Sequence, residues 1–224
     1  MIAIPAPTTV PVTGGNSFPV RRVYCVGRNY RAHAIEMGAD PDREAPFFFT
    51  KPADAVVPSG TTIAYPPRTG DYQHEIELVV AIGRRGRDIP VERAHEFVFG
   101  YAVGLDMTRR DLQIEARKAG RPWDMGKAFD ESAPCGEISP AATTGPLTGG
   151  AISVTVNGET RQSSDLSLLI WNVAEVIADL STYVELAPGD LIYTGTPEGV
   201  GPVQPGDRLV GRIDGLADLE VTIR

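Results

Sequence analysis

The chain has 224 residues, of which 42% are apolar and 22% are charged, a composition typical of a soluble globular protein with one large domain or two small ones. Its net charge of −8 is unfavourable for a general nucleic-acid binder or for a protein that binds anionic membranes. The 24 glycines and 19 prolines favour many turns and short strands over a helical bundle.

The two cysteines and the first residues bear on where the protein works. Cys25 and Cys135 lie far apart and outside any C-x-x-C pattern, so we expect neither a disulfide framework nor a thiolate metal site. Residues 1–16 lack a basic segment and a long apolar run, so we expect no signal peptide, no transmembrane segment and a cytoplasmic location. Residues 1–19 predict an extended arm or a short edge strand, followed by one domain over residues 20–224.

The segment from Arg28 to Gly38 follows a strand predicted at residues 21–27 and is typical of a short helix that ends at glycine. In such a helix His33 and Glu36 are three residues apart, so they share a face and can hydrogen-bond. A carboxylate beside an imidazole fixes its tautomer and raises its basicity, as in an acid–base pair. The alternative is an ordinary His–Glu pair on the surface.

A short buried strand is predicted at residues 46–52, and it ends in the basic residue Lys51. Lys51 faces an anion or caps a solvated edge, and the sequence does not decide between the two.

Two carboxylates stand two residues apart in an apolar segment, residues 74–82, that is typical of a strand. Strand side chains alternate between faces, so Glu75 and Glu77 point to one side, where they repel each other unless they are solvated or hold a cation. A second apolar segment, residues 97–105, ends in Asp106. If the two strands pair, three carboxylates converge on a hard divalent cation such as Mg²⁺ or Mn²⁺. The alternative is an exposed, solvated edge strand.

A helix is predicted after Asp106. Thr108 and Asp111 match the [ST]-x-x-[DE] capping box, which places the helix start here and its end near Lys118. Gln113 lies one turn inside this helix, near Arg110. The loop that follows contains Lys127 between glycine and aromatic residues, where a lysine is a surface residue unless an anion lies opposite.

The last third of the chain predicts turn-rich β structure. Asn157-Gly158 is a strong signal for a type I′ hairpin, and an amphipathic helix is expected over residues 167–180. Residues 194–201 form a loop rich in glycine and hydroxyl groups, in which backbone N–H groups and Thr196 can hold an anion. The alternative is a glycine-rich turn without a ligand.

Taken together and in this order, the motifs resemble those of the fumarylacetoacetate hydrolase superfamily over about nine tenths of the chain. The matching pieces are Gly27-Arg28-Asn29-Tyr30 with His33 and Glu36, Lys51-Pro52, His74-Glu75-Ile76-Glu77-Leu78, Leu105-Asp106-Met107-Thr108-Arg109-Arg110-Asp111, Lys127, Val156-Asn157-Gly158, Pro188-Gly189-Asp190 and Thr194-Gly195-Thr196-Pro197-Glu198-Gly199-Val200-Gly201. The chain is most similar to the single-domain acylpyruvase branch. Residues 47–52 and 121–127 look most like those of fumarylpyruvate hydrolases.

The resemblance implies a mixed α/β, mostly β fold, a β-sandwich roll with a few short helices, and a homodimer. It implies Mg²⁺ or Mn²⁺ held by Glu75, Glu77 and Asp106, and a 2,4-diketo acid as the small-molecule substrate, with no nucleic-acid or membrane partner. The enzyme would hydrolyse a C–C bond of the diketo acid, releasing pyruvate and, from fumarylpyruvate, fumarate.

Roles for the other residues follow from the same resemblance. His33, oriented by Glu36, would activate a water molecule, while Gln113 would position the water or stabilise the oxyanion, and Lys127 would stabilise the pyruvate enolate. The expected substrate-binding residues are Arg28, Arg110, Gly195 and Thr196, and the far carboxylate of a fumaryl group would need Arg28, Arg110 or Lys51.

Two alternatives remain at this point. The same metal site would serve an oxaloacetate decarboxylase or a hydroxymuconate-type isomerase, which do not need an activated water. A metal-stabilised binding module would make Lys127 and Gln113 dispensable.

Overall fold

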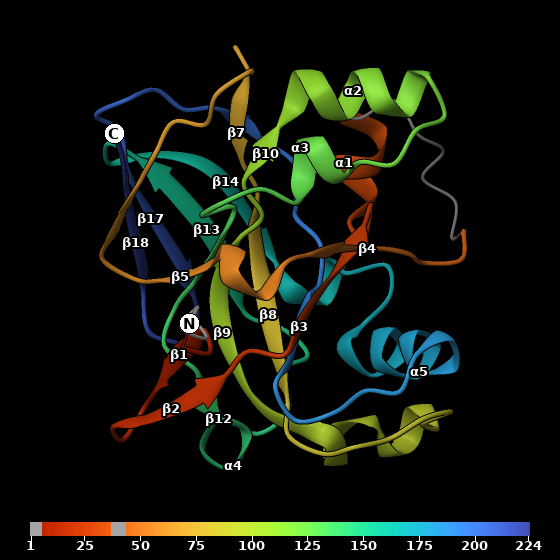
Figure 1. Cartoon of the computed structure of the whole chain (residues 1–224). Helices are drawn as coiled ribbons and strands as arrows, with labels where there is room; N and C mark the ends of the chain where they lie inside the picture. Colours follow the sequence, from red (N-terminus) through yellow and green to blue (C-terminus); the bar gives the residue numbers. More distant parts are fainter. Residues whose placement is uncertain (1–5, 37–43) are drawn as a thin grey trace, which may run out of the picture.

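In the computed structural model, residues 6–36 and 44–224 are described, and two facing β-sheets organise them (Figure 1). The larger sheet contains, in spatial order, β4 (Phe47–Lys51), β3 (Arg22–Gly27), β15 (Asp190–Tyr193), β8 (Ile76–Ile82), β9 (Val98–Leu105), β11 (Ala133–Cys135) and β5 (Val56–Pro58), with β12 (Ser139–Pro140) paired to β9. The second sheet contains β14 (Glu159–Asp165), β13 (Ala151–Val156), β17 (Arg208–Ile213), β18 (Leu219–Ile223) and β6 (Thr61–Ile63). The expected mostly-β architecture with few helices is confirmed.

The central strand β8 divides the hydrophobic core into two parts. Its even-numbered side chains, among them Ile76 and Leu78, lie in a core shared with the second sheet. Its odd-numbered side chains Val79 and Ala81 lie in a second core on the opposite face. Because side chains alternate along a strand, Glu77 belongs to the face of Val79 and Ala81. The carboxylate therefore stands at the end of an apolar row.

The N-terminal segment pairs with itself. Strands β1 (Thr9–Val12) and β2 (Asn16–Pro19) form an antiparallel hairpin, and its side chains Val10 and Phe18 are buried in the second core. Residues 1–5 of the predicted arm lie outside the described residues. The described part is therefore no edge strand of either large sheet, because β1 and β2 form a two-stranded sheet of their own. It is no loose arm either, because its apolar side chains lie in the same core as Val79 and Ala81 of β8.

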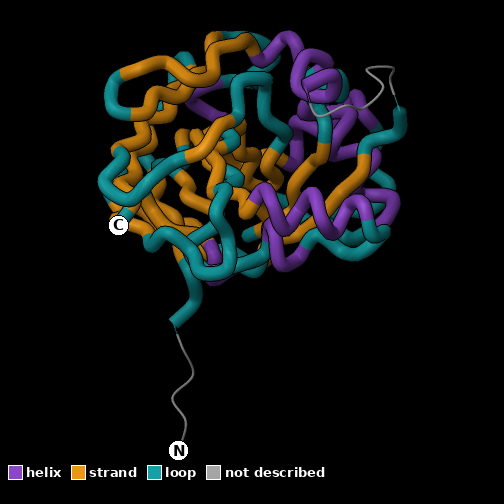
Figure 2. Tube along the Cα trace, turned by 90° about the horizontal axis from the view of Figure 1, so that it is seen from above, coloured by secondary structure: helices purple, strands orange, loops and turns teal. Residues whose placement is uncertain are grey.

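The helices gather mainly on one side of the molecule, as the view from above shows (Figure 2). They are α1 (Arg31–Glu36), α2 (Arg110–Lys118), α3 (Asp124–Lys127), α4 (Ala141–Thr144) and α5 (Val173–Tyr183), with short 3₁₀ turns at η1 (Ala53–Ala55), η2 (Val91–Phe97) and η3 (Leu166–Leu168). Helices α1, α2 and α3 lie together at one end of β8 (Figure 1). No helix in the described segments is long and apolar enough to cross a membrane.

Several predicted element boundaries need correction. The strand predicted at residues 74–82 is interrupted at Glu75, between β7 (Tyr72–His74) and β8, and β7 pairs with β10 (Thr108–Arg109) and β16 (Gly201–Pro202) in a separate three-stranded sheet. The helix predicted from residue 167 begins at Val173, because the side chain of Asn172 forms a capping box with Glu175 there.

The capping box predicted at Thr108 is wrong. Arg109 holds the N-cap position of α2 without a side-chain cap, and the Thr108 hydroxyl donates to the backbone oxygen of Asp106 at 3.1 Å. The Asp111 carboxylate instead accepts hydrogen bonds from Thr69 and Gly70. The motif matched by spacing, but its two side chains serve tertiary contacts.

The predicted hairpin turn is confirmed. Asn157 and Gly158 have φ values of 53° and 85°, as both central residues of a type I′ turn require. The turn joins β13 to β14 in antiparallel register.

Candidate active site

Three buried carboxylates meet where β8 and β9 lie side by side. Ile76, the first residue of β8, pairs with Leu105, the last residue of β9. Glu75 and Asp106, the next residues beyond this pair, are therefore neighbours. The Asp106 N–H donates to the Glu75 backbone oxygen at 2.9 Å. Ligand oxygens of Glu75, Glu77 and Asp106 all lie within 4.8 Å of one another. The alternative of a solvated edge strand is excluded, because β8 is central in its sheet and these side chains are buried.

Buried cations from other elements neutralise this acidic cluster. Lys127 Nζ lies 2.8 Å from Glu75 Oε2 and 2.7 Å from Asp106 Oδ2, and it donates to the Thr108 hydroxyl at 2.7 Å. Lys51 Nζ lies 2.8 Å from Asp106 Oδ1. Lys51 therefore faces an anion, which the sequence left open. An unpaired buried charge would be strongly destabilising, so the carboxylates and cations depend on one another.

The third cation of the cluster, Arg110, comes from the first turn of α2. Its Nη2 pairs with Glu75 Oε1, its Nη1 donates to Gln113 Oε1, and its Nε donates to Gln73 Oε1 at 2.8 Å. These contacts hold Arg110 and Gln113 in fixed positions beside the acidic cluster. Both side chains are buried, as a site built on rigid elements requires.

The charges within the cluster shift its pKa values in different directions. Burial raises the pKa of Glu75, but the neighbouring charges of Lys127 and Arg110 outweigh it, so the net effect lowers the pKa. Burial and the charge of Asp106 raise the pKa of Glu77 well above its ordinary value. The cluster thus combines one strongly ionised carboxyl with one that retains its proton more readily.

The donor set fits a hard divalent cation. Carboxylate oxygens are the ligands that Mg²⁺ and Mn²⁺ prefer. Asp106 Oδ1 is buried and accepts no hydrogen bond from the described part of the chain. Its neighbour is the Lys51 ammonium, at 2.8 Å. Burial is the largest cause of the raised pKa of Glu77, and a bound cation would offset the second cause, the repulsion from Asp106.

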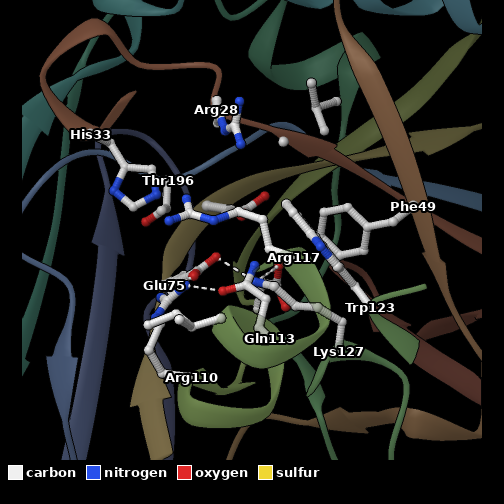
Figure 3. A pocket seen from close by; sticks show the side chains of 15 residues that line it. Arg28, His33, Phe49, Glu75, Arg110, Gln113, Arg117, Trp123, Lys127 and Thr196 are labelled. Atoms are coloured by element: carbon white, nitrogen blue, oxygen red, sulfur yellow. Dashed lines mark hydrogen bonds and ion pairs between the residues drawn. The ribbon is translucent and has the colours of Figure 1, made fainter. Parts of the chain in front are cut away.

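A histidine–glutamate pair lies at the same pocket. His33 Nδ1 lies 3.1 Å from Glu36 Oε2 on α1, and His33 lines the pocket together with the three carboxylates (Figure 3). The Gly199 N–H donates to Glu36 Oε1 at 3.2 Å, which holds the carboxylate from a second element. Because a carboxylate only accepts, Nδ1 carries the proton and Nε2 is left as the basic nitrogen.

The glycine-rich loop binds a carboxylate of the protein itself. The Gly195 N–H donates to Glu77 Oε2 at 2.6 Å, with Gly195 at a φ of 101° that favours glycine. Thr196 lines the pocket, and its hydroxyl accepts a hydrogen bond from Gln162 Nε2 at 2.9 Å. The predicted anion contact of this loop is therefore occupied by Glu77, and any effect of Gly195 on a ligand would act through that carboxylate.

Three polar or charged residues have positions here that the sequence does not predict: Thr108 and Lys51 contact the acidic cluster, and Arg117 lines the pocket. Thr108 was interpreted as a helix cap, and Lys51 was left undecided because its partner lies far away in the sequence. Arg117 was missed, although it continues the face of α2 that carries Arg110 and Gln113, at seven and four residues' distance. Helical spacing would have found it.

Comparison with known proteins places these features in a family. Residues 22–224 match the model of the fumarylacetoacetate hydrolase C-terminal domain. The chain is 54% identical over 189 residues to a fumarylpyruvate hydrolase of Ralstonia, covering 84% of this chain and 98% of that protein. It is 42% identical to an oxaloacetate tautomerase of Escherichia coli, covering 88% and 90% of the two chains.

A solved structure extends the comparison to the whole fold. The crystal structure of fumarylpyruvate hydrolase from Pseudomonas aeruginosa, in complex with Mn²⁺ and pyruvate, is 60% identical and superposes with a TM-score of 0.97. The match covers all of this chain and 98% of that one. The family model, the sequence identities and the shared fold agree: the chain belongs to the fumarylacetoacetate hydrolase family.

Proposed function

We propose that the protein is a divalent-metal-dependent hydrolase that cleaves fumarylpyruvate to fumarate and pyruvate. The observation that carries the proposal is the His33–Glu36 pair at the same pocket as the acidic triad, since a C–C hydrolase needs both a base and an electrophilic centre. The relatives named fumarylpyruvate hydrolase, at 54% and 60% identity, support this choice of substrate.

In this proposal Glu75, Glu77 and Asp106 hold Mg²⁺ or Mn²⁺. When bound there, such a cation polarises a substrate oxygen and stabilises developing negative charge, as a Lewis acid. Mn²⁺ is the ion named with the Pseudomonas aeruginosa protein. The buried cations hold Glu75 and Asp106 in place, and the Gly195 N–H holds Glu77.

His33 and Glu36 begin the hydrolysis. Nε2 of His33 takes a proton from water, and the resulting hydroxide attacks the C4 carbonyl of the diketo acid. Glu36 keeps the proton on Nδ1 and favours the imidazolium that forms, as the 3.1 Å contact allows. Gln113, fixed by Arg110, donates through its amide N–H to the attacking water or to the oxyanion at C4.

Lys127 serves the second half of the reaction. The C3–C4 bond breaks, the electron pair leaves with C3 as the enolate of pyruvate, and C4 becomes the new carboxylate of fumarate. The buried Lys127 ammonium stabilises the negative charge of the enolate. Its pKa supports this role: burial lowers the pKa, but Asp106 and Glu75 outweigh the burial, so the net shift is upward and the group stays charged. The proton that His33 took from water is then returned to C3, which gives pyruvate and restores the neutral imidazole.

The direct test follows the diketo acid itself. Purified protein with Mn²⁺ should remove the ultraviolet absorbance of fumarylpyruvate and form one pyruvate and one fumarate per substrate. EDTA should stop the reaction and excess Mn²⁺ should restore it. A protein that leaves fumarylpyruvate intact under these conditions would refute the proposal.

A second candidate is an oxaloacetate-converting enzyme, either a tautomerase or the decarboxylase that the sequence left open. Enol–keto conversion is supported by the relative at 42% identity that is named an oxaloacetate tautomerase. Oxaloacetate offers the same carboxylate and 2-keto oxygen, but neither reaction needs an activated water. Turnover of oxaloacetate that exceeds that of fumarylpyruvate would favour this candidate.

The remaining expectations belong to the same proposal. We expect one catalytic domain over residues 20–224, a homodimer and a cytoplasmic role in the breakdown of aromatic compounds. Light scattering coupled to gel filtration tests the dimer, for which a mass near twice 24.0 kDa is expected.

A further inference from the structure

The cationic side chains of the catalytic pocket fall into two groups. Arg28, Arg110, Arg117 and Lys127 line it, and the acidic residues that line it in the described part of the chain are those of the triad. Arg110 and Lys127 are buried, whereas Arg28 is half-buried and Arg117 is exposed. We call Arg28 and Arg117 the rim cations. We call the three triad carboxylates, together with Lys127 and Arg110, the floor.

The floor cations are engaged by the floor carboxylates. Lys127 bridges Glu75 and Asp106, and Arg110 pairs with Glu75 and the amide oxygens of two glutamines. A second carboxylate of a substrate would have to compete with these buried contacts. The floor therefore suits the reacting end of the diketo acid, and the other end of a dianionic substrate needs a different partner.

Arg117 is positioned by the helix that carries the floor. Arg110, Gln113 and Arg117 stand at positions i, i+3 and i+7 of α2, so they share one face, and all three line the pocket (Figure 3). Seven residues of helix correspond to about 10 Å along its axis. One rigid element thus presents a floor contact and a rim cation at a distance set by the helix.

Apolar side chains form part of the pocket wall. Phe49, Ile114 and Trp123 line the same pocket, and the Phe49 and Trp123 rings lie 5.8 Å apart. At the first residue of β4, the Phe47 ring lies against the Arg28 guanidinium, with 5.5 Å between the guanidinium carbon and the ring centre. A substrate with charge at both ends and a flat carbon chain between them would use all three kinds of lining: the rim cations, the apolar wall and the floor.

We propose that Arg117, with Arg28, binds the far carboxylate of the acyl group and so selects dicarboxylic acylpyruvates over those with an uncharged acyl end. A guanidinium can bind a carboxylate through two parallel hydrogen bonds, which gives orientation as well as attraction. The inference rests on the proposed hydrolase function and adds the determinant of its substrate class.

The test compares two substrates that differ in that carboxylate. The kcat/KM values for fumarylpyruvate and for acetylpyruvate are measured for the wild type, Arg117→Ala, Arg117→Lys and Lys118→Ala. We expect Arg117→Ala to lower the fumarylpyruvate-to-acetylpyruvate ratio by about 10- to 100-fold, the range for a hydrogen bond to a charged group, mainly through the KM for fumarylpyruvate. Arg117→Lys should lower it less, because the charge remains.

Lys118→Ala is the matched control, because it removes one positive charge from the next position of α2, outside the pocket. It should keep the wild-type ratio. A ratio that Arg117→Ala leaves within twofold of the wild type, or that Lys118→Ala lowers equally, would overturn the proposal. All variants should melt at the wild-type temperature, because both side chains are exposed.

Binding without turnover separates this inference from the proposed function. If the wild type hydrolyses neither acylpyruvate, the hydrolase function fails by itself. Calorimetric binding of fumarate and of the monocarboxylate crotonate then tests the rim directly. Arg117→Ala should weaken the binding of fumarate more than the binding of crotonate. Equal weakening of both affinities would refute the role of the rim.

Discussion

The floor and the rim of the pocket are built in different ways. The floor carboxylates stand on or beside the paired strands β8 and β9, and the floor cations stand on α2 and α3. All are almost completely buried, with Asp106 at 0% and Lys127 at 2% exposure. The rim residues stand on the loop after β3 and in the last turn of α2, at half-buried and exposed positions. The His33–Glu36 pair lies between these extremes, with side-chain exposures of 8% and 37%.

This difference separates chemistry from selectivity. Loss of an ion-paired floor residue removes a partner from a buried charge, whereas a rim residue can change at little cost to the fold. The relatives include one named fumarylpyruvate hydrolase and one named oxaloacetate tautomerase. The predictions below test this separation, beginning with the largest expected effect.

Removal of a triad carboxylate should abolish metal binding and strongly reduce turnover. In Glu77→Gln we expect Mn²⁺ to lose its effect on the melting temperature and hydrolysis to fall on the order of 10³-fold, since the cation contributes several kcal/mol to the transition state. Glu92→Gln, at an exposed position of η2, should behave as the wild type. Retention of Mn²⁺-dependent turnover in Glu77→Gln would remove this residue from the metal site.

Loss of a floor cation should destabilise the fold. Lys127→Met leaves Glu75 and Asp106 without their shared partner, so the metal-free protein should lose about 3–5 kcal/mol of unfolding free energy. Added Mn²⁺ should restore part of the loss, because its charge replaces that of the ammonium. Urea denaturation with and without Mn²⁺ measures both effects, and unchanged stability of the metal-free variant would show that the cluster is not mutually dependent.

The base should be separable from the metal site. His33→Ala should reduce hydrolysis by about 10²- to 10⁴-fold, the usual contribution of general-base catalysis, and should keep Mn²⁺ affinity near the wild-type value. Glu36→Gln should cause a smaller loss, because the imidazole remains. Calorimetric titration with Mn²⁺ checks the binding, and an active His33→Ala enzyme would exclude the water-activating role.

The affinity for Mn²⁺ should fall as the pH is lowered. Burial and Asp106 raise the pKa of Glu77, so this carboxyl holds its proton to a higher pH than an ordinary one and must release it when Mn²⁺ binds. Affinity should therefore fall as the pH is lowered through the raised pKa, by up to about tenfold per pH unit for one proton. Titration in buffers of different ionisation enthalpy reports the released proton, and the same apparent affinity in acid and neutral buffer would contradict the prediction.

Local patterns in the sequence determined much of the molecule. Alternation and apolar content predicted the strands that became β8 and β9, and the Asn157-Gly158 turn followed from backbone preference alone. The two glutamates and Asp106 were recognisable because each stands at the end of an apolar strand segment, where pairing of neighbouring strands brings the ends together. The order of motifs also predicted the family that the comparisons show.

Only the tertiary structure decided how the carboxylates are neutralised and what each nearby polar residue does. Lys51 and Lys127 stand on different elements, far from Glu75 and Asp106 in the sequence, so no local spacing predicts their ion pairs. Thr108 matched a capping box, yet its hydroxyl accepts from Lys127. Such contacts depend on long-range packing and on the cost of burying charge, which local sequence patterns do not encode.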